Sequence, residues 1–203
     1  RCPFKLKEEI EILIRDEKID ILSLTECDFA NEITAKDFVI DGFKTIPQKS
    51  KGKIRTMLII KSDIKFTDIT QESSLPLASL KIQLKNGKSL IIVSIYREIV
   101  KTIKEGENQL KDLDSFLSGS KNNSVIVLGD FNLDRSQSSN PKWQNYKMAK
   151  WLEELSQKNT LTIRDCGTTY LYEKAQKGSV LDYFLVTEDL LETSYFKTIT
   201  NGV

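Results

Sequence analysis

The chain has 203 residues, of which 39% are hydrophobic, and this length and composition predict one globular domain with a sizeable core. The 30 Lys and Arg residues nearly balance the 29 Asp and Glu residues, which predicts no polyanionic partner but is compatible with a local basic face. The absence of histidine excludes Ser-His-Asp triads, Cys-His dyads and histidine metal sites built from these residues. Three widely spaced cysteines argue against a disulfide framework or a zinc site. With no apolar run long enough to span a membrane, we expect a soluble intracellular protein.

The first half of the sequence predicts one helix followed by a series of strands. Leu6, Ile10, Leu13 and Ile14 are spaced for one face of a helix. Runs rich in Ile, Leu and Val predict strands over residues 19–26, 54–61, 63–69, 78–84 and 88–97. Asn86-Gly87, between the last two runs, is typical of a tight hairpin turn.

The second half alternates between helices and strands. Leucines predict an amphipathic helix over residues 104–118, and SVIVLGD predicts a strand over 124–130. Asn140-Pro141 is typical of a helix start, and the face of the helix that follows is lined by Met148, Trp151, Leu152 and Leu155. The remaining strands are expected at 161–165, 168–172 and 180–186. This pattern predicts a single α+β domain over residues 1–203, with two packed β-sheets flanked by helices.

Polar and mostly acidic side chains stand where several predicted strands end. These residues are Glu26 after ILSLT, Tyr96 and Arg97 after IIVSI, Asp130 and Asn132 in GDFN, and Asp182 just inside VLDYFLV. Charged side chains are costly to bury without partners, so a shared site at these strand ends is an economical explanation. Because side chains alternate along a strand, we expect Glu26 on the face of Leu24 and Asp130 on the face of Leu128.

Carboxylates with an amide, and without thiolate or imidazole, suit a hard cation such as Mg²⁺ or Mn²⁺ with oxygen ligands and retained waters. Plainer interpretations remain open. Asp130 and Asn132 are also compatible with an ordinary turn, Tyr96 with a sheet aromatic, and Arg97 and Asp182 with structural ion pairs. The basic segment KSKGKIR is compatible with a solvated loop or with contact to a phosphate backbone.

The motifs LSLTE, IYR, GDFN and SVLDYFLV occur in an order and spacing that resemble the endonuclease/exonuclease/phosphatase superfamily. This superfamily includes abasic-site DNA repair endonucleases and the endonuclease domains of non-LTR (LINE-type) retrotransposons. The YR after IIVSI, the helix MAKWLEEL and the pair TTYLY and GSVLDYF are most similar to the retrotransposon branch. The resemblance implies a DNase I-like four-layer α/β sandwich.

The resemblance also implies a catalytic role for several matching residues. It makes Glu26 the principal ligand of Mg²⁺ or Mn²⁺, and Asp130 the base that orients or deprotonates the attacking water. Asn132 would steady this water and the scissile phosphate, and Tyr96 would donate a hydrogen bond to a phosphate oxygen. Asp182 would orient a catalytic histidine.

Two further residues are assigned to the substrate on the same basis. Arg97 would bind the phosphate beside Tyr96, and Ser179 would help to shape the phosphate pocket. The implied function is a Mg²⁺-dependent phosphodiester hydrolase that nicks double-stranded DNA. Its expected location is the nucleus, in a polypeptide that also carries a reverse transcriptase domain.

The sequence departs from the family pattern at both ends. The family normally opens with a strand that ends in an asparagine metal ligand, and it closes with a Ser-Asp-His strand. This chain opens with Arg-Cys-Pro, ends at Asn201-Gly202-Val203 and has no histidine. We therefore expect a domain truncated at both ends, inactive or weakly active by itself. Two other functions stay open: a phosphatase or exonuclease acting on another phosphoester, and an inactive domain retained as a binding module.

Overall fold

The computed structural model describes residues 7–50, 52–99, 102–135, 146–165, 167, 170–172 and 177–192. In these ranges the elements follow in the order α1 (Lys7–Asp16), β1 (Ile21–Phe29), α2 (Glu32–Lys36), β2 (Phe43–Pro47), β3 (Ile54–Lys61), β4 (Thr67–Asp68), β5 (Leu77–Gln83), β6 (Ser89–Tyr96), α3 (Ile103–Gly119), β7 (Ser124–Asp130), α4 (Tyr146–Lys158), β8 (Leu161–Asp165), β9 (Tyr170–Tyr172), β10 (Lys177–Ser179), β11 (Asp182–Thr187) and α5 (Glu188–Leu191). None of the helices in these ranges has the length and apolar character needed to cross a membrane.

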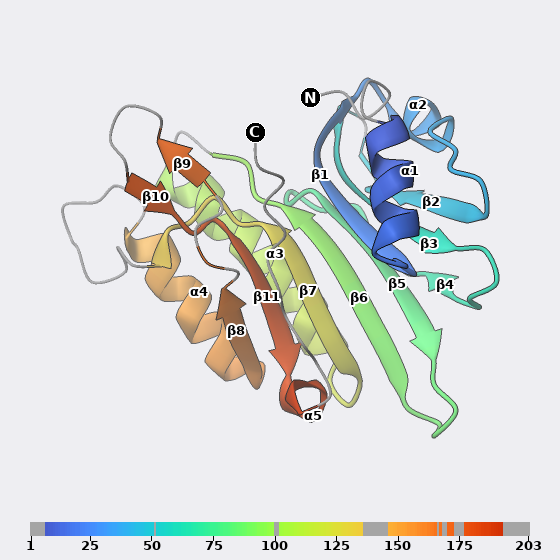
Figure 1. The fold of residues 1–203 in the computed structure, drawn as a ribbon. Coiled ribbons are helices and arrows are strands. Elements are labelled where there is room, and N and C mark those ends of the chain that lie inside the picture. Colours follow the sequence, from blue (N-terminus) through green and yellow to red (C-terminus); the bar gives the residue numbers. More distant parts are fainter. Residues whose placement is uncertain are drawn as a thin grey trace.

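Two sheets pack face to face between two layers of helices (Figure 1). In the described part of the chain, the smaller of these sheets has the strand order β1-β3-β2 and the larger has the order β4-β5-β6-β7-β11-β8, while β9 and β10 pair in a separate two-stranded sheet. Helices α1 and α2 cover the outer face of the smaller sheet, and α3 and α4 cover the outer face of the larger one. The expected α+β fold with two packed sheets flanked by helices is confirmed.

Strand β3 shows why the central strands read as nearly continuous apolar runs. Met57 and Ile59 pack against the α1 side, whereas Leu58 and Ile60 pack against the larger sheet. Both faces of the strand are therefore buried, and an alternating polar face is not needed. The same alternation in β6 and β7 divides their side chains between the α3–α4 layer and the space between the sheets.

A tight turn and a helical crossover set the order of the strands in the larger sheet. Asn86-Gly87 turns the chain between β5 and β6, where the Leu84 amide donates to the Lys88 carbonyl at 2.8 Å, as the sequence predicts. Strands β6 and β7 are parallel, so a crossover must join them, and α3 provides it. Helix α3 begins with a capping box between Thr102 and Glu105, and its leucines pack onto the sheet.

Gly129 allows β7 to approach β6 closely at the end of this parallel pair. Gly129 lies opposite Ile95 and has a φ of 137°, a conformation that side chains rarely adopt. A Cβ atom added at this position would lie 2.0 Å from the Ile95 carbonyl oxygen, which is part of the sheet backbone. Only glycine therefore fits next to the residue pair that ends these strands.

Some elements differ from the sequence prediction. The strand expected over 63–69 is reduced to Thr67–Asp68, because the Ile64 amide donates to the Lys61 carbonyl and turns the chain out of the sheet. Strand β2 and helix α2 were not expected. Asn140-Pro141 lies outside the described residues, so the structure leaves that helix start untested.

We expect Gly129→Ala to destabilise the protein by about 3 kcal/mol, because its Cβ would force β6 and β7 apart. Gly87→Ala is a matched control: Gly87 also has a positive φ, of 81°, but nothing lies within 4 Å of an added Cβ. The control should cost about 1 kcal/mol. Urea denaturation measures both changes, and equal losses in the two variants would contradict the close-approach explanation.

Candidate active site

Three neighbouring strands bring three of the predicted site residues into one row. Tyr96 at the end of β6 lies opposite Asp130 at the end of parallel β7. Asp182 at the start of β11 lies opposite Asp130 from the other side. The pairing continues beyond the strand ends, since the Arg97 amide donates to the Asp130 carbonyl at 2.8 Å. Residues far apart in the sequence thus meet at one edge of the larger sheet.

The turn after β7 holds the Asp130 carboxylate in place. The Asn132 amide donates to Asp130 Oδ1 at 2.8 Å, and Asn132 Nδ2 lies 3.2 Å from Asp130 Oδ2. Asn132 Nδ2 also donates to the Arg97 carbonyl at 2.8 Å, and the residue has a left-handed φ of 48°. GDFN therefore comprises the end of β7 and the turn that follows it, and this turn fixes the orientation of the carboxylate.

Tyr183 supports this turn from below, a role that the sequence analysis missed. Its hydroxyl lies 2.6 Å from the Val180 carbonyl oxygen and 2.8 Å from that of Leu133, and it accepts a hydrogen bond from the Arg135 amide at 3.1 Å. Its ring meets that of Phe131 edge-on. Burial raises the pKa of Tyr183 to about 12, so its hydroxyl stays protonated. A tyrosine in an otherwise apolar core strand was the available signal, because a buried hydroxyl needs partners.

Glu26 reaches the site through a bulge in β1. The side chains that pack on the α1 side are those of Leu22 and Leu24 before the bulge, and Cys27 and Phe29 after it. The pairing of β1 with β3 shifts between Thr25 and Phe29, and Glu26 has a left-handed φ of 55°. The expectation that Glu26 shares the face of Leu24 is therefore wrong. The extra residue turns Glu26 toward the larger sheet, where its carboxylate meets Tyr96.

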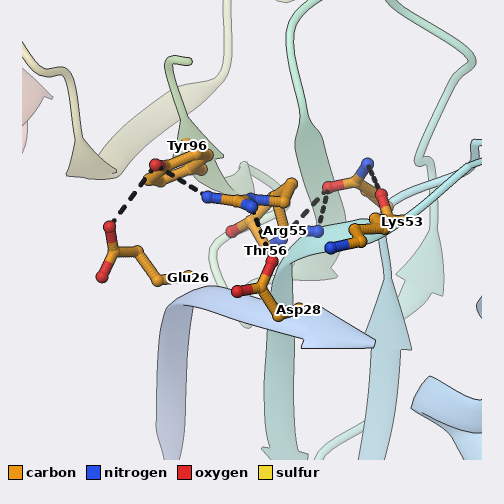
Figure 2. Close-up of polar contacts among 7 residues, drawn as sticks. Glu26, Asp28, Lys53, Arg55, Thr56 and Tyr96 are labelled. Atoms are coloured by element: carbon orange, nitrogen blue, oxygen red, sulfur yellow. Dashed lines mark hydrogen bonds and ion pairs between the residues drawn. The ribbon is translucent and has the colours of Figure 1, made fainter. Parts of the chain in front are cut away.

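Glu26 and Tyr96 belong to a chain of polar contacts that crosses between the sheets (Figure 2). The Tyr96 hydroxyl lies 3.4 Å from Glu26 Oε1 and accepts a hydrogen bond from Arg55 Nη2 at 2.9 Å. Arg55 Nη1 forms an ion pair with Asp28 Oδ1 at 2.6 Å. No role for Asp28 was expected from the sequence, and Arg55 was considered only as the last residue of the basic segment KSKGKIR. The available signal was a charged residue inside the apolar run IRTMLII.

Three hydroxyl groups tie the two sheets together below this chain of contacts. Ser94 Oγ on β6 lies 2.5 Å from Ser23 Oγ on β1 and 2.6 Å from Thr56 Oγ1 on β3. Thr56 also donates to the Leu24 carbonyl at 3.1 Å, and both Thr56 and Ser94 are fully buried. These satisfied hydrogen bonds fix the height of β1 against β6, and therefore the distance from Glu26 to Tyr96.

Arg97 and Ser179 occupy positions that differ from those of the other predicted residues. Arg97 is 1% exposed, because the alternation along β6 turns it away from the face of Tyr96. Its Nη1 lies 3.4 Å from the carbonyl oxygens of Phe131 and Asn132, beneath the turn after β7. Ser179 is buried in β10, opposite Tyr170, and no hydrogen bond found among the described residues joins it to the acids.

Burial at these strand ends favours the protonated, neutral forms of Asp130 and Tyr96. Burial raises the pKa of Asp130 to about 7, and the nearby charges of Asp182 and Glu26 add to this effect. Burial also raises the pKa of Tyr96, and Arg55 opposes that effect. Burial lowers the pKa of Arg97 to about 10, against the attraction of Asp130. Arg97 still carries its charge at neutral pH.

The donor set fits a metal ion only if other ligands complete the coordination sphere. Among the described residues, no three Asp, Glu, Cys or His side chains gather closely enough to hold an ion by themselves. Glu26 is exposed and ends the row as a single carboxylate. Mg²⁺ is commonly held by one or two carboxylates, with waters and substrate phosphate oxygens as the other ligands. The residues present fit an ion of that kind.

Comparisons with known proteins give a consistent assignment. The family model for endonuclease-reverse transcriptase matches residues 90–202, which is more than half of the chain. A comparison with curated protein sequences gave no match. The matched segment contains the ends of β6 and β7 and all of β11, so it includes Tyr96, Asp130 and Asp182.

Solved structures share the fold at low sequence identity. The endonuclease domain of TRAS1, a telomere-specific non-LTR retrotransposon, is 18% identical with a TM-score of 0.66, over 91% of this chain and 80% of that one. The 3'-5' exonuclease NExo from Neisseria meningitidis is 17% identical with a TM-score of 0.67, over 96% and 87%. The APE2 catalytic domain from Xenopus laevis is 13% identical with a TM-score of 0.66, over 90% and 78%.

At identities this low, the structural likeness shows that these proteins share a fold. The match to the family model shows which family the chain belongs to. The DNase I-like arrangement expected from the sequence motifs is confirmed by the structural neighbours. The chain therefore belongs to the endonuclease-reverse transcriptase family, within the endonuclease/exonuclease/phosphatase superfamily of phosphoester hydrolases.

Proposed function

We propose that the protein is a Mg²⁺-dependent phosphodiester hydrolase that nicks DNA at the row of residues from Glu26 to Asp182. The observation that carries this proposal is the meeting of Tyr96, Asp130 and Asp182 on three adjacent strands, with Glu26 turned toward them by the bulge in β1. Phosphoester hydrolysis needs a base in a fixed position and hydrogen-bond donors close to it. Asp130 can provide the base, and Tyr96 and Asn132 can provide the donors.

Asp130 is the proposed general base. Its pKa of about 7 lies near a neutral working pH, where a base is most effective at taking a proton from water. The water oxygen bonds to phosphorus as its proton passes to Asp130, and the bond from phosphorus to the leaving oxygen breaks. The hydrogen bond from the Asn132 amide orients the carboxylate for this step. Asp182 favours the protonated form of Asp130 through its charge, and so helps to set this pKa.

Tyr96 and Asn132 are the proposed contacts to the phosphate and the water. The Tyr96 hydroxyl faces the space beside Glu26 and would donate to a phosphate oxygen. Asn132 Nδ2 already donates to the Arg97 backbone carbonyl and lies beside Asp130 Oδ2. Asn132 would therefore hold the water through its Oδ1 atom. Glu26 would bind the metal ion. A bound Mg²⁺ would offset the negative charge that develops on the phosphate.

Arg97 is proposed to support the catalytic turn, in place of the phosphate contact expected from the sequence. Its burial and its position beneath Phe131 and Asn132 suit a structural cation close to Asp130. Ser179 remains a proposed part of the phosphate pocket, at the edge that β10 forms.

Double-stranded DNA is the substrate we propose, in a nuclear protein whose parent polypeptide carries a reverse transcriptase domain. We propose that residues 1–203 form one domain of that polypeptide. The family description names both activities, and the TRAS1 neighbour is the endonuclease domain of a retrotransposon. A second NExo structure, of a variant described as a 3' phosphatase, is bound to a product DNA hairpin. These descriptions support a DNA substrate over a small phosphoester.

Nicking of supercoiled plasmid tests the proposal, because a single cut converts the whole circle to the open form. We expect slow nicking by the 203-residue chain that requires Mg²⁺. Asp130→Ala and Glu26→Gln should each slow it by about a hundredfold or more, since each removes a member of a coupled catalytic set. Glu154→Gln, an exposed carboxylate on α4, is the control and should nick at the wild-type rate.

Two results would count against the nuclease. One is equal nicking by the wild type and Asp130→Ala. The other is no nicking by the chain or by any longer polypeptide that its gene encodes. In the second case, DNA binding without cleavage in a filter-binding assay would favour an inactive domain retained for binding.

The raised pKa of Asp130 also predicts a pH dependence of stability. The folded state holds the Asp130 proton more tightly than the unfolded state, whose carboxyl has a pKa near 3.8. Asp130 therefore lowers the free energy of unfolding as the pH rises from about 4 to about 7. Asp130→Asn removes this titration, so at pH 8 it should stabilise the protein by about 2 kcal/mol once solvent screening is allowed for.

Urea denaturation at pH 5 and pH 8 measures this effect. At pH 5 the folded carboxyl is largely protonated while the unfolded one is already largely ionised, so the stability difference between the two proteins should be less than half of that at pH 8. An Asp130→Asn variant that is equally or less stable than the wild type at pH 8 would contradict the raised pKa.

A further inference from the structure

Arg55 is a charged side chain near the start of the largely apolar strand β3. Its neighbours Ile54 and Thr56 are fully buried, while the Arg55 side chain is 21% exposed. Its guanidinium lies over the Tyr96 ring at 4.6 Å from the centroid and donates through Nη2 to the Tyr96 hydroxyl at 2.9 Å. Figure 2 shows Arg55 between Tyr96 and Asp28.

The backbone of Arg55 is fixed by a buried amide side chain. Gln48 Oε1 accepts hydrogen bonds from the backbone amides of Arg55 and Thr56, at 2.9 and 3.1 Å. Gln48 Nε2 donates to the Lys53 carbonyl at 3.2 Å, and Gln48 itself is 4% exposed. Gln48 therefore fixes the backbone at the start of β3, and this backbone sets the direction in which the Arg55 side chain projects.

Asp28 fixes the other end of the side chain. Its Oδ1 lies 2.6 Å from Arg55 Nη1, and its own backbone has a left-handed φ of 53°, within the same bulge that turns Glu26. The planar guanidinium is thus held at two nitrogens and over one aromatic ring. An isolated exposed ion pair contributes little, but three contacts on one planar group define its orientation.

This arrangement constrains the Tyr96 proton. A guanidinium has only donors, so in the Arg55–Tyr96 hydrogen bond the phenol oxygen must be the acceptor. The Tyr96 hydroxyl proton then has to point away from Arg55. The acceptor on that side is Glu26 Oε1 at 3.4 Å, which is long for an O–H···O bond and leaves room for a closer acceptor to take its place.

We propose that Arg55 is a positioning residue that directs the Tyr96 hydroxyl proton toward a phosphate oxygen bound beside Glu26. This inference rests on the proposed phosphodiester hydrolysis, and it adds Arg55 and its anchor Asp28 to the residues on which that reaction depends. Arg55 acts through Tyr96 and has no separate contact with the reacting phosphate.

The first test does not depend on activity. The chain is labelled with ¹³Cζ-tyrosine, and the Tyr96 signal is assigned from Tyr96→Phe. At neutral pH, Arg55→Met should move the Tyr96 Cζ signal, because the phenol oxygen loses a hydrogen-bond donor. Asp28→Asn, which keeps the guanidinium but loosens it, should move the signal less. Arg15→Met, an exposed arginine on α1, is the control and should leave it unchanged.

The second test is a double-mutant cycle with plasmid nicking. Arg55→Met should lower kcat about tenfold with little change in KM, and Arg55→Lys should restore only part of the rate. Since Arg55 acts through Tyr96, adding Arg55→Met to Tyr96→Phe should slow the reaction no further.

Two results would overturn the proposal. One is an unchanged Tyr96 Cζ signal in Arg55→Met. The other is a double variant slower than Tyr96→Phe by the full factor that Arg55→Met causes alone, since Arg55 would then act independently of Tyr96. If neither the 203-residue chain nor a longer polypeptide from its gene cuts DNA, the proposed nuclease is contradicted, and the NMR test alone decides whether Arg55 orients Tyr96.

Discussion

The parallel pairing of β6 and β7 is the constraint on which the site depends. It places Tyr96 beside Asp130, and it requires the close approach of Gly129 to the Ile95 carbonyl. Antiparallel β11 then adds Asp182 on the other side. Because α3 crosses over one face of the sheet, the ends of β6 and β7 point the same way, and their terminal polar residues collect at one edge.

A second constraint brings the smaller sheet into the site. The bulge in β1 places Glu26 and Asp28 in left-handed conformations, which are costly for residues other than glycine. The hydroxyl contacts of Ser94 with Ser23 and Thr56 hold this bulged strand against the larger sheet. The strained backbone therefore lies where Glu26 meets Tyr96. The hydrogen bonds of Ser94 between the two sheets hold the strand in this conformation.

The sequence predicts the local elements well and their cross-sheet contacts poorly. Strand β7 and the Asn86-Gly87 turn are each specified by a few consecutive residues, so both were identified from the sequence. The direction of Glu26 was not, because one left-handed residue reverses the alternation that the prediction assumed. Arg55 meets Tyr96 across a separation of 41 residues in sequence, and only the packing of the two sheets brings them together.

The metal binding proposed for this row of residues is tested by paramagnetic line broadening with Mn²⁺ in the ¹⁵N-labelled chain. We expect the amide signals of Glu26, Tyr96 and Asp130 to broaden first and Glu26→Gln to abolish this effect. Broadening centred instead on distant acids such as Asp112 or Asp189, and unchanged in Glu26→Gln, would contradict this expectation.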